Sequence, residues 1–467
     1  MKIALFMSGS FAQLMRHFSG FMPGVVLTAI CPNWQSYQVC KKESGFYRVD
    51  YIFTDFNSLF DSGNYLDFVN RHNEINIYEV LSVDKTHYKK MSGNYQLRYI
   101  SAVGERLEDL FLSDKPDYIF FPIIETIEAM LAYKLAIAFG IRPIVYCNSR
   151  FSSLSFFSES FQETLPCYTD LCESNDQDLA WSRLFLKEYR ENPKPFNIMS
   201  VDFPGTDCMD FGKKGNVILK FIRNLWLRRG VERHNKLISH WISIQIYLQR
   251  IALPIRGFIF YINERWFIRP GGQPSGKFDF FPLHFSPESS INVPAPYYID
   301  QLRVVDKILL ERSDGNHPLI IKEHPAMFGF REKGFYKKLI RRPLVEFVRK
   351  ELPSVDLIKR ASTVYSVTGT ACLEAFFLGV KWKQYGVNFL SDWFVRNAEK
   401  LKGGDADVEQ FICDVRSVSK EFVLYSPGIS VMRDKLLFSR KNISRICEHL
   451  KFHVAMDSKF RSLSEGK

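Results

Sequence analysis

Short apolar runs that each lead through a turn into an amphipathic segment recur along this chain. In the first half, residues 1–7 form such a run, Ser8-Gly9-Ser10 form the turn, and residues 11–18 have helical spacing. The same alternation returns at 117–122, 127–139 and 143–147. Continuous apolar runs of this length are typical of buried parallel strands, and the helices between them indicate an α/β fold.

The alternation starts again in the second half. Expected strands cover 278–285, 319–322, 363–367 and 381–385, and expected helices cover 297–312, 336–340 and 371–378. Two halves of this kind predict two doubly wound, Rossmann-like domains that face a cleft, with ligands at the carboxyl ends of the strands. The predicted segments are an N-terminal domain at 1–205, a helical connector at 206–270, a second domain at 271–400 and C-terminal helices at 401–467.

The composition is that of a globular protein with more than one domain. The 467 residues suggest two or three domains, and 46% hydrophobic with 24% charged residues excludes a disordered or fibrous chain. The formal net charge of +11 favours polyanionic partners, such as phosphorylated substrates or anionic lipid. No nucleic-acid-binding module is recognisable, so we expect no nucleic acid partner.

Several features point to a cytoplasmic protein without a metal. The nine cysteines form no Cys-x-x-Cys pair and have no zinc-like spacing to histidine, which indicates reduced thiols. The N-terminal apolar run is too short for a signal peptide, and no uncharged apolar run of about 18 residues predicts a membrane span. Asp405-Ala406-Asp407 spells an acidic triplet that some transferases use for a cation, but its place before a helical pattern favours helix capping.

Residues 213–256 carry ten basic residues and a single acidic residue, Glu232. Their apolar neighbours recur near helical spacing, which indicates basic amphipathic helices between the two domains. Such helices can lie on an anionic membrane surface. Alternatively, they connect the domains with their apolar side buried and their arginines solvated.

The strongest site pattern is three loops that follow expected strands of the second half. They cover residues 282–290, 322–325 and 368–370. Because the carboxyl ends of parallel strands meet at one edge of a sheet, we expect the three loops to surround one ligand.

The third loop has the chemistry of a phosphate site. Thr368-Gly369-Thr370 begins a helix, where backbone N–H groups and the helix dipole attract an anion. The same residues are also typical of an ordinary threonine N-cap. Glu374, one turn further on, can accept two ribose hydroxyls or can simply complement the helix dipole.

Acid–base candidates come from three positions. His324 follows an apolar strand and precedes Pro325, so its imidazole can face the cleft as a general acid, or it is an ordinary loop histidine. Glu288 can act as a base or bind the nucleotide, or it caps the next helix. Glu125, after the strand at 117–122, can act as a base or nucleophile, or it is only an acidic residue near a helix start.

The ordered motifs of the second half resemble the capsule-polysaccharide biosynthesis glycosyltransferases, which include the retaining β-Kdo transferases. The matching residues are Leu283-His284, Pro287-Glu288-Ser289, Lys322-Glu323-His324-Pro325, Arg331, Tyr336, Thr368-Gly369-Thr370 and Glu374-Ala375. This resemblance covers residues 278–390. The first half matches in outline only, at 122–125 and at Ser149-Arg150.

The resemblance implies a GT-B-like fold and a CMP-activated donor such as CMP-Kdo, with no further cofactor. It implies that Lys322-Glu323-His324-Pro325 and Thr368-Gly369-Thr370 bind the donor phosphate, and that Glu374 binds the ribose. Lys322 and Arg331 can pair with a carboxylate of the donor sugar. A glycan or lipid-linked glycan acceptor would bind on the N-terminal side.

These observations lead us to expect a glycosyltransferase of bacterial surface-polysaccharide assembly that acts at the inner face of the membrane. Two alternatives remain open. One is a GT-B transferase that uses a UDP-sugar, and the other is a non-catalytic scaffold of polysaccharide assembly that has kept the fold.

Overall fold

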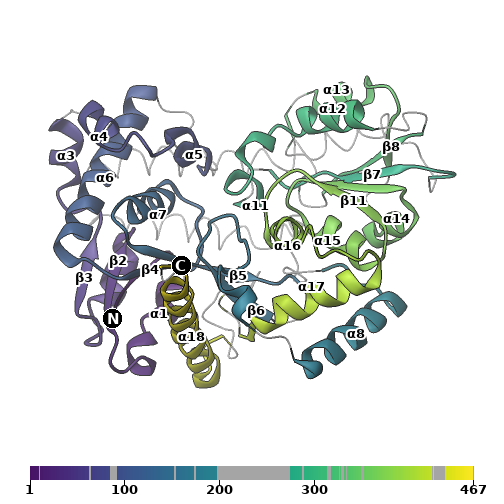
Figure 1. Cartoon of the computed structure of the whole chain (residues 1–467). Helices are drawn as coiled ribbons and strands as arrows, with labels where there is room; N and C mark the ends of the chain where they lie inside the picture. The colour runs from purple at the N-terminus through teal and green to yellow at the C-terminus, as the bar shows by residue number, and fades with distance from the viewer. Residues whose placement is uncertain are drawn as a thin grey trace, which may run out of the picture. The chain divides into compact units, whose positions relative to one another are not determined.

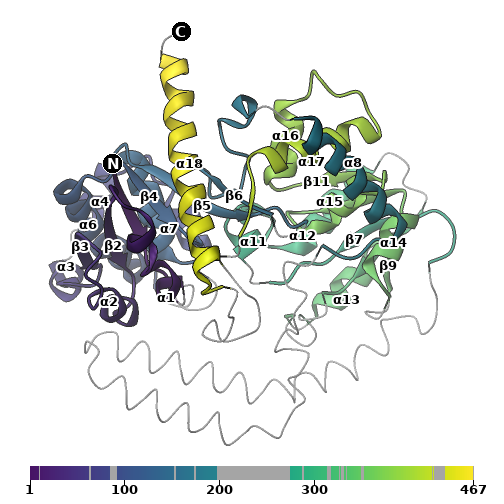
Figure 2. The ribbon, with the colours of Figure 1, turned by 90° about the horizontal axis from the view of Figure 1, so that it is seen from below.

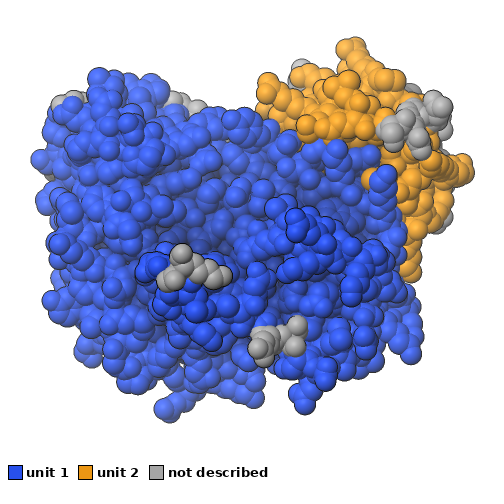
Figure 3. Space-filling model, viewed as in Figure 1, with its two compact units in different colours: residues 1–198, 287–299, 364–467 blue, residues 199–286, 300–363 orange. Residues whose placement is uncertain are grey.

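The computed structural model describes residues 1–196 and 274–465, except positions 10, 63–64, 85–91, 152–153, 173–174, 287–288, 313–316, 325–326, 328–330, 333, 349–351, 423 and 425–436. The chain forms two compact units, coloured in Figure 3. Unit 1 comprises Met1–Ile198, Pro287–Ile299 and Val364–Lys467, and unit 2 comprises Met199–Ser286 and Asp300–Thr363. The basic connector at 206–270 and the site candidates Glu288 and Pro325 lie outside the described residues, and the predicted domain boundaries stay a prediction.

Unit 1 contains a seven-stranded sheet with the strand order β12-β6-β5-β4-β1-β2-β3 (Figure 1). Its strands are β1 (Lys2–Phe6), β2 (Val26–Cys31), β3 (Arg48–Tyr51), β4 (Tyr118–Phe121), β5 (Arg142–Asn148), β6 (Leu154–Ser158) and β12 (Lys420–Glu421). The first five strands in the chain pair in parallel, with β1 and β2 in register from Lys2↔Val26 to Phe6↔Ile30. β6 and β12 pair antiparallel at the other edge.

Both faces of this sheet are buried, which explains why its strands are apolar without alternation. Ala4 and Phe6 of β1 contribute to one core, and Ile3 and Leu5 contribute to the other. The first core contains residues of α3 (Phe56–Ser62), α4 (Tyr65–Arg71), α5 (Ile77–Ser82), α6 (Gly93–Asp114) and α7 (Ile127–Ala138). The second contains residues of α1 (Phe11–Met15), α2 (Trp34–Cys40) and α18 (Arg440–Glu465). Helices on both faces of a mainly parallel sheet make this a doubly wound arrangement.

The C-terminal part of the chain completes the sheet of unit 1. β12 pairs with β6 through Lys420↔Ser155 and Glu421↔Leu154. The long helix α18, yellow in Figure 2, packs Leu450 and its neighbours into the second core. The first sheet is therefore assembled from segments that lie hundreds of residues apart.

The second sheet has the strand order β11-β10-β7-β8-β9. Its strands are β7 (Asp279–Pro282), β8 (Leu319–Lys322), β9 (Val345–Val348), β10 (Thr363–Ser366) and β11 (Lys381–Gln384). β7, β8 and β9 are parallel, with β7 and β8 in register from Asp279↔Leu319 to Pro282↔Lys322. Among the described residues of unit 2, the helices are α12 (Gln301–Glu311), α13 (Phe335–Ile340) and α14 (Ser354–Arg360).

A third core in unit 1 joins helices from the middle and the end of the chain. Phe377 packs with Phe151 and Phe411 at ring-centroid distances of 5.4 and 6.1 Å. The helices concerned are α8 (Asp176–Glu191), α15 (Thr370–Phe377), α16 (Phe389–Arg396) and α17 (Asp405–Ser417). A short helix, α11 (Ser289–Asn292), also belongs to unit 1.

The predicted α/β fold with parallel sheets is confirmed. Each of the seven strands predicted from the sequence is present, with ends within a few residues of the prediction. The helix predicted at 297–312 instead divides into a 3-10 turn at Pro296–Tyr298 and α12, because the Asp300 carboxylate accepts a hydrogen bond from the Leu302 N–H at 3.0 Å and starts the helix there. β2, β3, β6, β9 and β12 were not predicted.

None of the described helices combines the length and apolar character needed to cross a bilayer.

Candidate active site

The carboxyl edge of the first sheet carries Glu125, the acid–base candidate from the first half of the chain, together with the residues that follow the neighbouring strands. β1, β4 and β5 are parallel neighbours, so the residues that follow them share one edge. Ser8 follows β1, Glu125 follows β4, and Arg150 follows β5. Glu125 is partly exposed, and the neighbouring Thr126 caps α7 by accepting a hydrogen bond from Ala129 N at 3.3 Å. The catalytic role of Glu125 stays a prediction.

Arg150 connects this edge to the Thr368-Gly369-Thr370 turn, which also belongs to unit 1. Its Nη1 donates to the Thr368 carbonyl at 2.7 Å, and its Nη2 donates to Glu163 at 2.6 Å. Asn388 Nδ2 donates to the same carbonyl at 3.4 Å. Arg150 adopts φ of +66°, a conformation unusual for a non-glycine residue, and only 9% of its side chain is exposed. The Thr368 carbonyl is thus held by two side chains.

The turn leads into α15 with a glycine at the N-cap. Gly369 occupies that position without a side-chain cap, and its N–H donates to Ser366 Oγ at 3.1 Å. The Thr370 hydroxyl donates to Glu374 Oε1 at 3.0 Å. The ordinary threonine N-cap, which was the alternative interpretation, is therefore not what the described residues form.

Glu374 is a buried carboxylate with 4% of its surface exposed. Besides the Thr370 hydroxyl, Oε1 accepts the backbone N–H of Phe196 at 3.4 Å. Burial raises the pKa of the adjacent Tyr189, and the charge of Glu374 raises it further. The hydrogen bonds from Thr370 and Phe196 fix the position of the Glu374 carboxylate before any ribose binds. Ribose binding itself stays a prediction.

In unit 2, two predicted loops leave neighbouring strand ends. The Leu283 N–H donates to the Lys322 carbonyl at 2.8 Å, which extends the pairing of β7 and β8 by one step. His284 comes directly after Leu283 in the loop that follows β7, and His324 lies in the loop that follows β8. Lys322 is 7% exposed, and its Nζ donates to Ser354 Oγ at 2.9 Å.

Glu323 is the centre of this second group, although the sequence predicted a role for it only as one member of the Lys322-Glu323-His324-Pro325 loop. It is 3% exposed, accepts the His324 N–H at 2.7 Å, forms an ion pair with Arg331 at 2.8 Å and accepts the Tyr336 hydroxyl. Arg331 Nη2 also donates to the His284 carbonyl at 2.6 Å. Arg331, predicted to meet a carboxylate of the donor, thus contacts a carboxylate of the protein. The only sequence signal for Glu323 was a charged residue at the end of an apolar strand.

His324 has a neutral imidazole at neutral pH. Burial lowers its pKa, Glu323 raises it, and Arg331 and Lys322 lower it further, with a net decrease. Its ring lies 5.8 Å from that of Phe285. A neutral imidazole can still donate one N–H to a phosphate oxygen.

The acidic triplet at 405–407 stabilises the start of α17. Asp405 forms two hydrogen bonds of 2.7 Å with Arg190. Asp407 accepts the backbone N–H groups of Lys402 and Gly403 at 2.9 and 2.8 Å. The triplet lies at the start of α17, as predicted, but the N-cap is Gly404 and has no side-chain cap. The two aspartates bind Arg190 and the backbone that precedes the helix instead.

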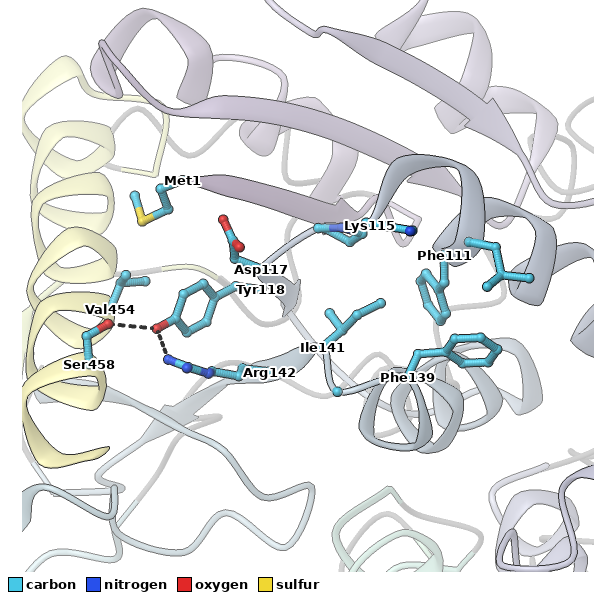
Figure 4. Close-up of a pocket in the computed structure, with 13 residues that line it drawn as sticks. Met1, Phe111, Lys115, Asp117, Tyr118, Phe139, Ile141, Arg142, Val454 and Ser458 are labelled. Carbon is cyan, nitrogen blue, oxygen red and sulfur yellow. Dashed lines mark hydrogen bonds between the residues drawn. The ribbon is translucent and has the colours of Figure 1, made fainter. Parts of the chain in front are cut away.

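A cavity of about 650 Å³ opens at the amino ends of β4 and β5 (Figure 4). Asp117, Tyr118 and Arg142 line it, together with Ser458 of α18. Asp117 accepts the backbone N–H of Lys2 at 2.7 Å. None of the described site candidates lines this cavity, which lies away from the carboxyl edge that carries Glu125 and Arg150.

The chain matches no protein-family model and no curated protein. Among solved structures, it is similar to two β-Kdo transferase structures of KpsC from Thermosulfurimonas dismutans. The β-Kdo 2,7 transferase has 12% identity and a TM-score of 0.33 over 69% of this chain and 84% of that chain. The β-Kdo 2,4 transferase has 11% identity and a TM-score of 0.35 over 66% and 85%.

A UDP-GlcNAc 2-epimerase from Methanocaldococcus jannaschii is also similar, with 13% identity and a TM-score of 0.22 over 97% of this chain and 99% of that chain. TM-scores this low establish neither a family nor an activity for this chain.

Proposed function

We propose that this protein is a glycosyltransferase of bacterial surface-polysaccharide assembly. It transfers Kdo or a related acidic sugar from a CMP-activated donor to a glycan or lipid-linked glycan acceptor. The ordered motifs of the second half support this proposal, because they resemble those of the capsule-polysaccharide glycosyltransferases.

The observation that carries the proposal is the position of the Thr368-Gly369-Thr370 turn. Arg150 and Asn388 both bind the Thr368 carbonyl, at 2.7 and 3.4 Å, and Gly369 begins α15. A fixed turn at a helix start is suited to a phosphate, since the N–H groups of a first helical turn and the helix dipole attract an anion. Pre-organisation reduces the cost of ordering the site when a nucleotide binds.

The second group of residues would act on the leaving phosphate. In this proposal His324 donates an N–H to the phosphate oxygen, and Glu323 with Arg331 holds the loop that carries it. Lys322 supplies positive charge near the same phosphate. Glu125, at the carboxyl edge of the first sheet, serves as base or nucleophile on the acceptor side, and Glu288 and Pro325 complete the donor site.

Incubation with CMP-Kdo and a panel of glycan acceptors, followed by mass spectrometry, tests the activity. Transfer of one sugar mass to an acceptor, with release of CMP, is the expected result. Thermal-shift titrations with CMP, CDP and UDP then separate the alternatives. Stabilisation by UDP alone favours the UDP-sugar transferase, and no stabilisation by any nucleotide favours the non-catalytic scaffold.

We further propose that residues 213–256 attach the protein to the inner face of the cytoplasmic membrane. Ten basic residues against one acidic residue support this, because each cation near an anionic bilayer contributes about 1 kcal/mol. The protein should sediment with anionic liposomes at low salt and be released at about 1 M salt, where the Debye length is about 3 Å. Equal binding to neutral liposomes, or retained binding after Arg223, Arg228 and Arg229 are changed to Gln, would mean that the segment is only a connector.

A further inference from the structure

Three side chains with metal-binding atoms converge where the loop after β6 meets α18. Glu159 follows β6, Cys167 lies on that loop, and Asp457 lies on α18. One carboxylate oxygen from each acid and the cysteine sulfur all lie within 4.8 Å of one another. Cys167 Sγ is 3.5 Å from Glu159 Oε1 and 3.8 Å from Asp457 Oδ1. None of these residues has a part in the proposed sugar transfer.

These separations fit the edges of a ligand tetrahedron around one zinc ion. Zinc–sulfur bonds of about 2.3 Å and zinc–oxygen or zinc–nitrogen bonds of about 2.0–2.2 Å place neighbouring ligand atoms roughly 3.3–3.8 Å apart. The two sulfur–oxygen distances lie in that range. A single ion can therefore reach the cluster without a large movement of the backbone.

A buried nitrogen of His453 lies next to Glu159, one member of this cluster. It precedes Asp457 by four residues on α18, so both side chains lie on one face of the helix, and only 1% of His453 is exposed. Its Nε2 is 3.7 Å from Glu159 Oε1 and makes no hydrogen bond within the described part of the chain. A buried polar atom without a partner is uncommon, and a metal ion would satisfy it.

Tyr168 holds the imidazole in the orientation that a metal requires. The Tyr168 hydroxyl lies 2.9 Å from His453 Nδ1. With its proton on Nδ1, the ring donates to the Tyr168 oxygen and presents the lone pair of Nε2 on the side of Glu159. Histidine ligands in metal sites usually make such an outer hydrogen bond.

Asp457 is held by groups outside the cluster. Its Oδ2 accepts the Tyr118 hydroxyl and Arg142 Nη1, each at 3.0 Å, and Oδ1 accepts Arg461 Nε at 3.1 Å. Figure 4 shows Arg142 and Ser458 beside the Tyr118 hydroxyl. Two carboxylates and a thiolate exceed the charge of one zinc ion by one, and the two nearby guanidinium groups offset that excess.

We propose that Glu159, Cys167, His453 and Asp457 form a zinc site that fastens α18 to the loop after β6. Sulfur and imidazole ligands favour zinc over magnesium or calcium. On binding, the Cys167 S–H bond breaks, its proton leaves to solvent, and the thiolate forms the bond to zinc. No electron transfer is needed. The competing explanation is that the thiol donates weak hydrogen bonds to the two carboxylates without any metal.

Zinc titration of the purified full chain, after treatment with a chelator, tests the site. We expect one tightly bound zinc ion per chain. Cobalt substitution should give the near-ultraviolet absorption of a thiolate–cobalt bond. Cys167→Ser should abolish that absorption and weaken zinc binding at least tenfold, and His453→Gln should weaken it about 10- to 100-fold. Cys172→Ser is the matched control, because Cys172 is also partly buried but lies outside the cluster. The Cys172→Ser variant should keep both the thiolate–cobalt absorption and the zinc affinity of the wild type.

Absence of zinc binding in the wild-type chain overturns the proposal. So does a cobalt complex without thiolate absorption, or zinc binding that is unchanged in Cys167→Ser. If Cys167→Ser does not fold, the cobalt spectra of the wild-type chain and of Cys172→Ser decide the matter. Because the measurements concern zinc binding alone, they are independent of the proposed transferase activity.

Discussion

The guanidinium of Arg150 donates a 2.7 Å hydrogen bond to the carbonyl of Thr368, a residue 218 positions later in the chain. This bond joins the carboxyl end of β5 to the turn that begins α15. The same guanidinium binds Glu163 at 2.6 Å, so one planar side chain serves two acceptors. The proposed phosphate site therefore depends on the first half of the chain for its shape.

Arg150→Lys should weaken nucleotide binding while the fold is retained. Lysine keeps the positive charge but lacks the planar fork that reaches both acceptors. We expect the dissociation constant of CMP to rise about tenfold, which corresponds to about 1.4 kcal/mol. Isothermal titration calorimetry measures this dissociation constant. Arg183→Lys is the control, since Arg183 forms an exposed ion pair with Glu409 and should bind CMP as the wild type does. Equal affinities in the two variants would refute the role of Arg150.

Glu374→Gln distinguishes ribose binding from a purely structural role. The amide keeps the shape and still accepts the Thr370 hydroxyl, but it loses the charge that strengthens hydrogen bonds from ribose. CMP affinity should fall by about 1–3 kcal/mol. If Glu374 only complements the dipole of α15, the loss should appear in the melting temperature instead, equivalent to roughly 0.3–1 kcal/mol. Calorimetry with CMP beside a thermal melt separates the two outcomes.

Glu323→Gln should strongly destabilise the protein. The substitution leaves Arg331, whose side chain is 5% exposed, buried without its anionic partner. Loss of one member of a buried ion pair costs about 3–5 kcal/mol. Denaturant unfolding provides the measurement. Asp306→Asn removes the 50% exposed partner of Arg342 and should cost no more than about 1 kcal/mol. Similar losses of unfolding free energy in both variants would contradict the view that Glu323 stabilises the protein through a buried ion pair.

The activity that depends on His324 should be highest when the imidazole is neutral. Because burial lowers the pKa of His324 below its usual value of about 6.5, the neutral form predominates from neutral pH upward. We expect kcat to stay level above pH 7 and to fall in acid. His324→Ala should lower kcat by about 10²- to 10⁴-fold with little change in melting temperature. A rate that declines as pH rises through 6 to 7 would instead indicate a cationic acid.

His449 should make the protein less stable in mild acid. Burial lowers its pKa to about 3, and His453 and Lys420 contribute to the decrease. The unfolded chain takes up a proton below about pH 6.5 and the folded chain does not, so stability is complete above that pH and is lost as pH falls toward 3. Between pH 7 and pH 5 we expect a loss of about 2 kcal/mol from this residue. Urea unfolding should show that His449→Phe loses less unfolding free energy between pH 7 and pH 5 than the wild type does. Equal losses would exclude His449 as the cause of the acid sensitivity.

Several strands of the parallel sheets were predictable because burial on both faces leaves an uninterrupted apolar run. β1, β4, β7 and β8 show this in their own residues, whereas the parallel strands β2, β3 and β9 were not predicted. The turn at 368–370 was predictable from its Thr-Gly-Thr sequence. The two-residue β12 was not predictable, because it pairs with β6 more than 260 positions earlier in the chain. β6, which pairs with β5 as well as with β12, was not predicted either. Likewise, Glu323 can be recognised as a buried ion-pair partner only once the structure places Arg331 and Tyr336 around it.

The attachment of β12 and α18 to the first sheet has a consequence for biosynthesis. Phe422 and Leu450 complete a core that begins with Ile3 and Leu5, so the part of the second sheet face that α18 covers stays exposed while the intervening chain is made. At about 5–20 residues per second, the 262 residues that follow position 205 take about 13–52 s to synthesise. During that interval an emerging chain presents an apolar sheet face to its surroundings. We expect ribosome-bound chains that stop before α18 to be bound by chaperones and to be cut by proteases where the complete protein resists them.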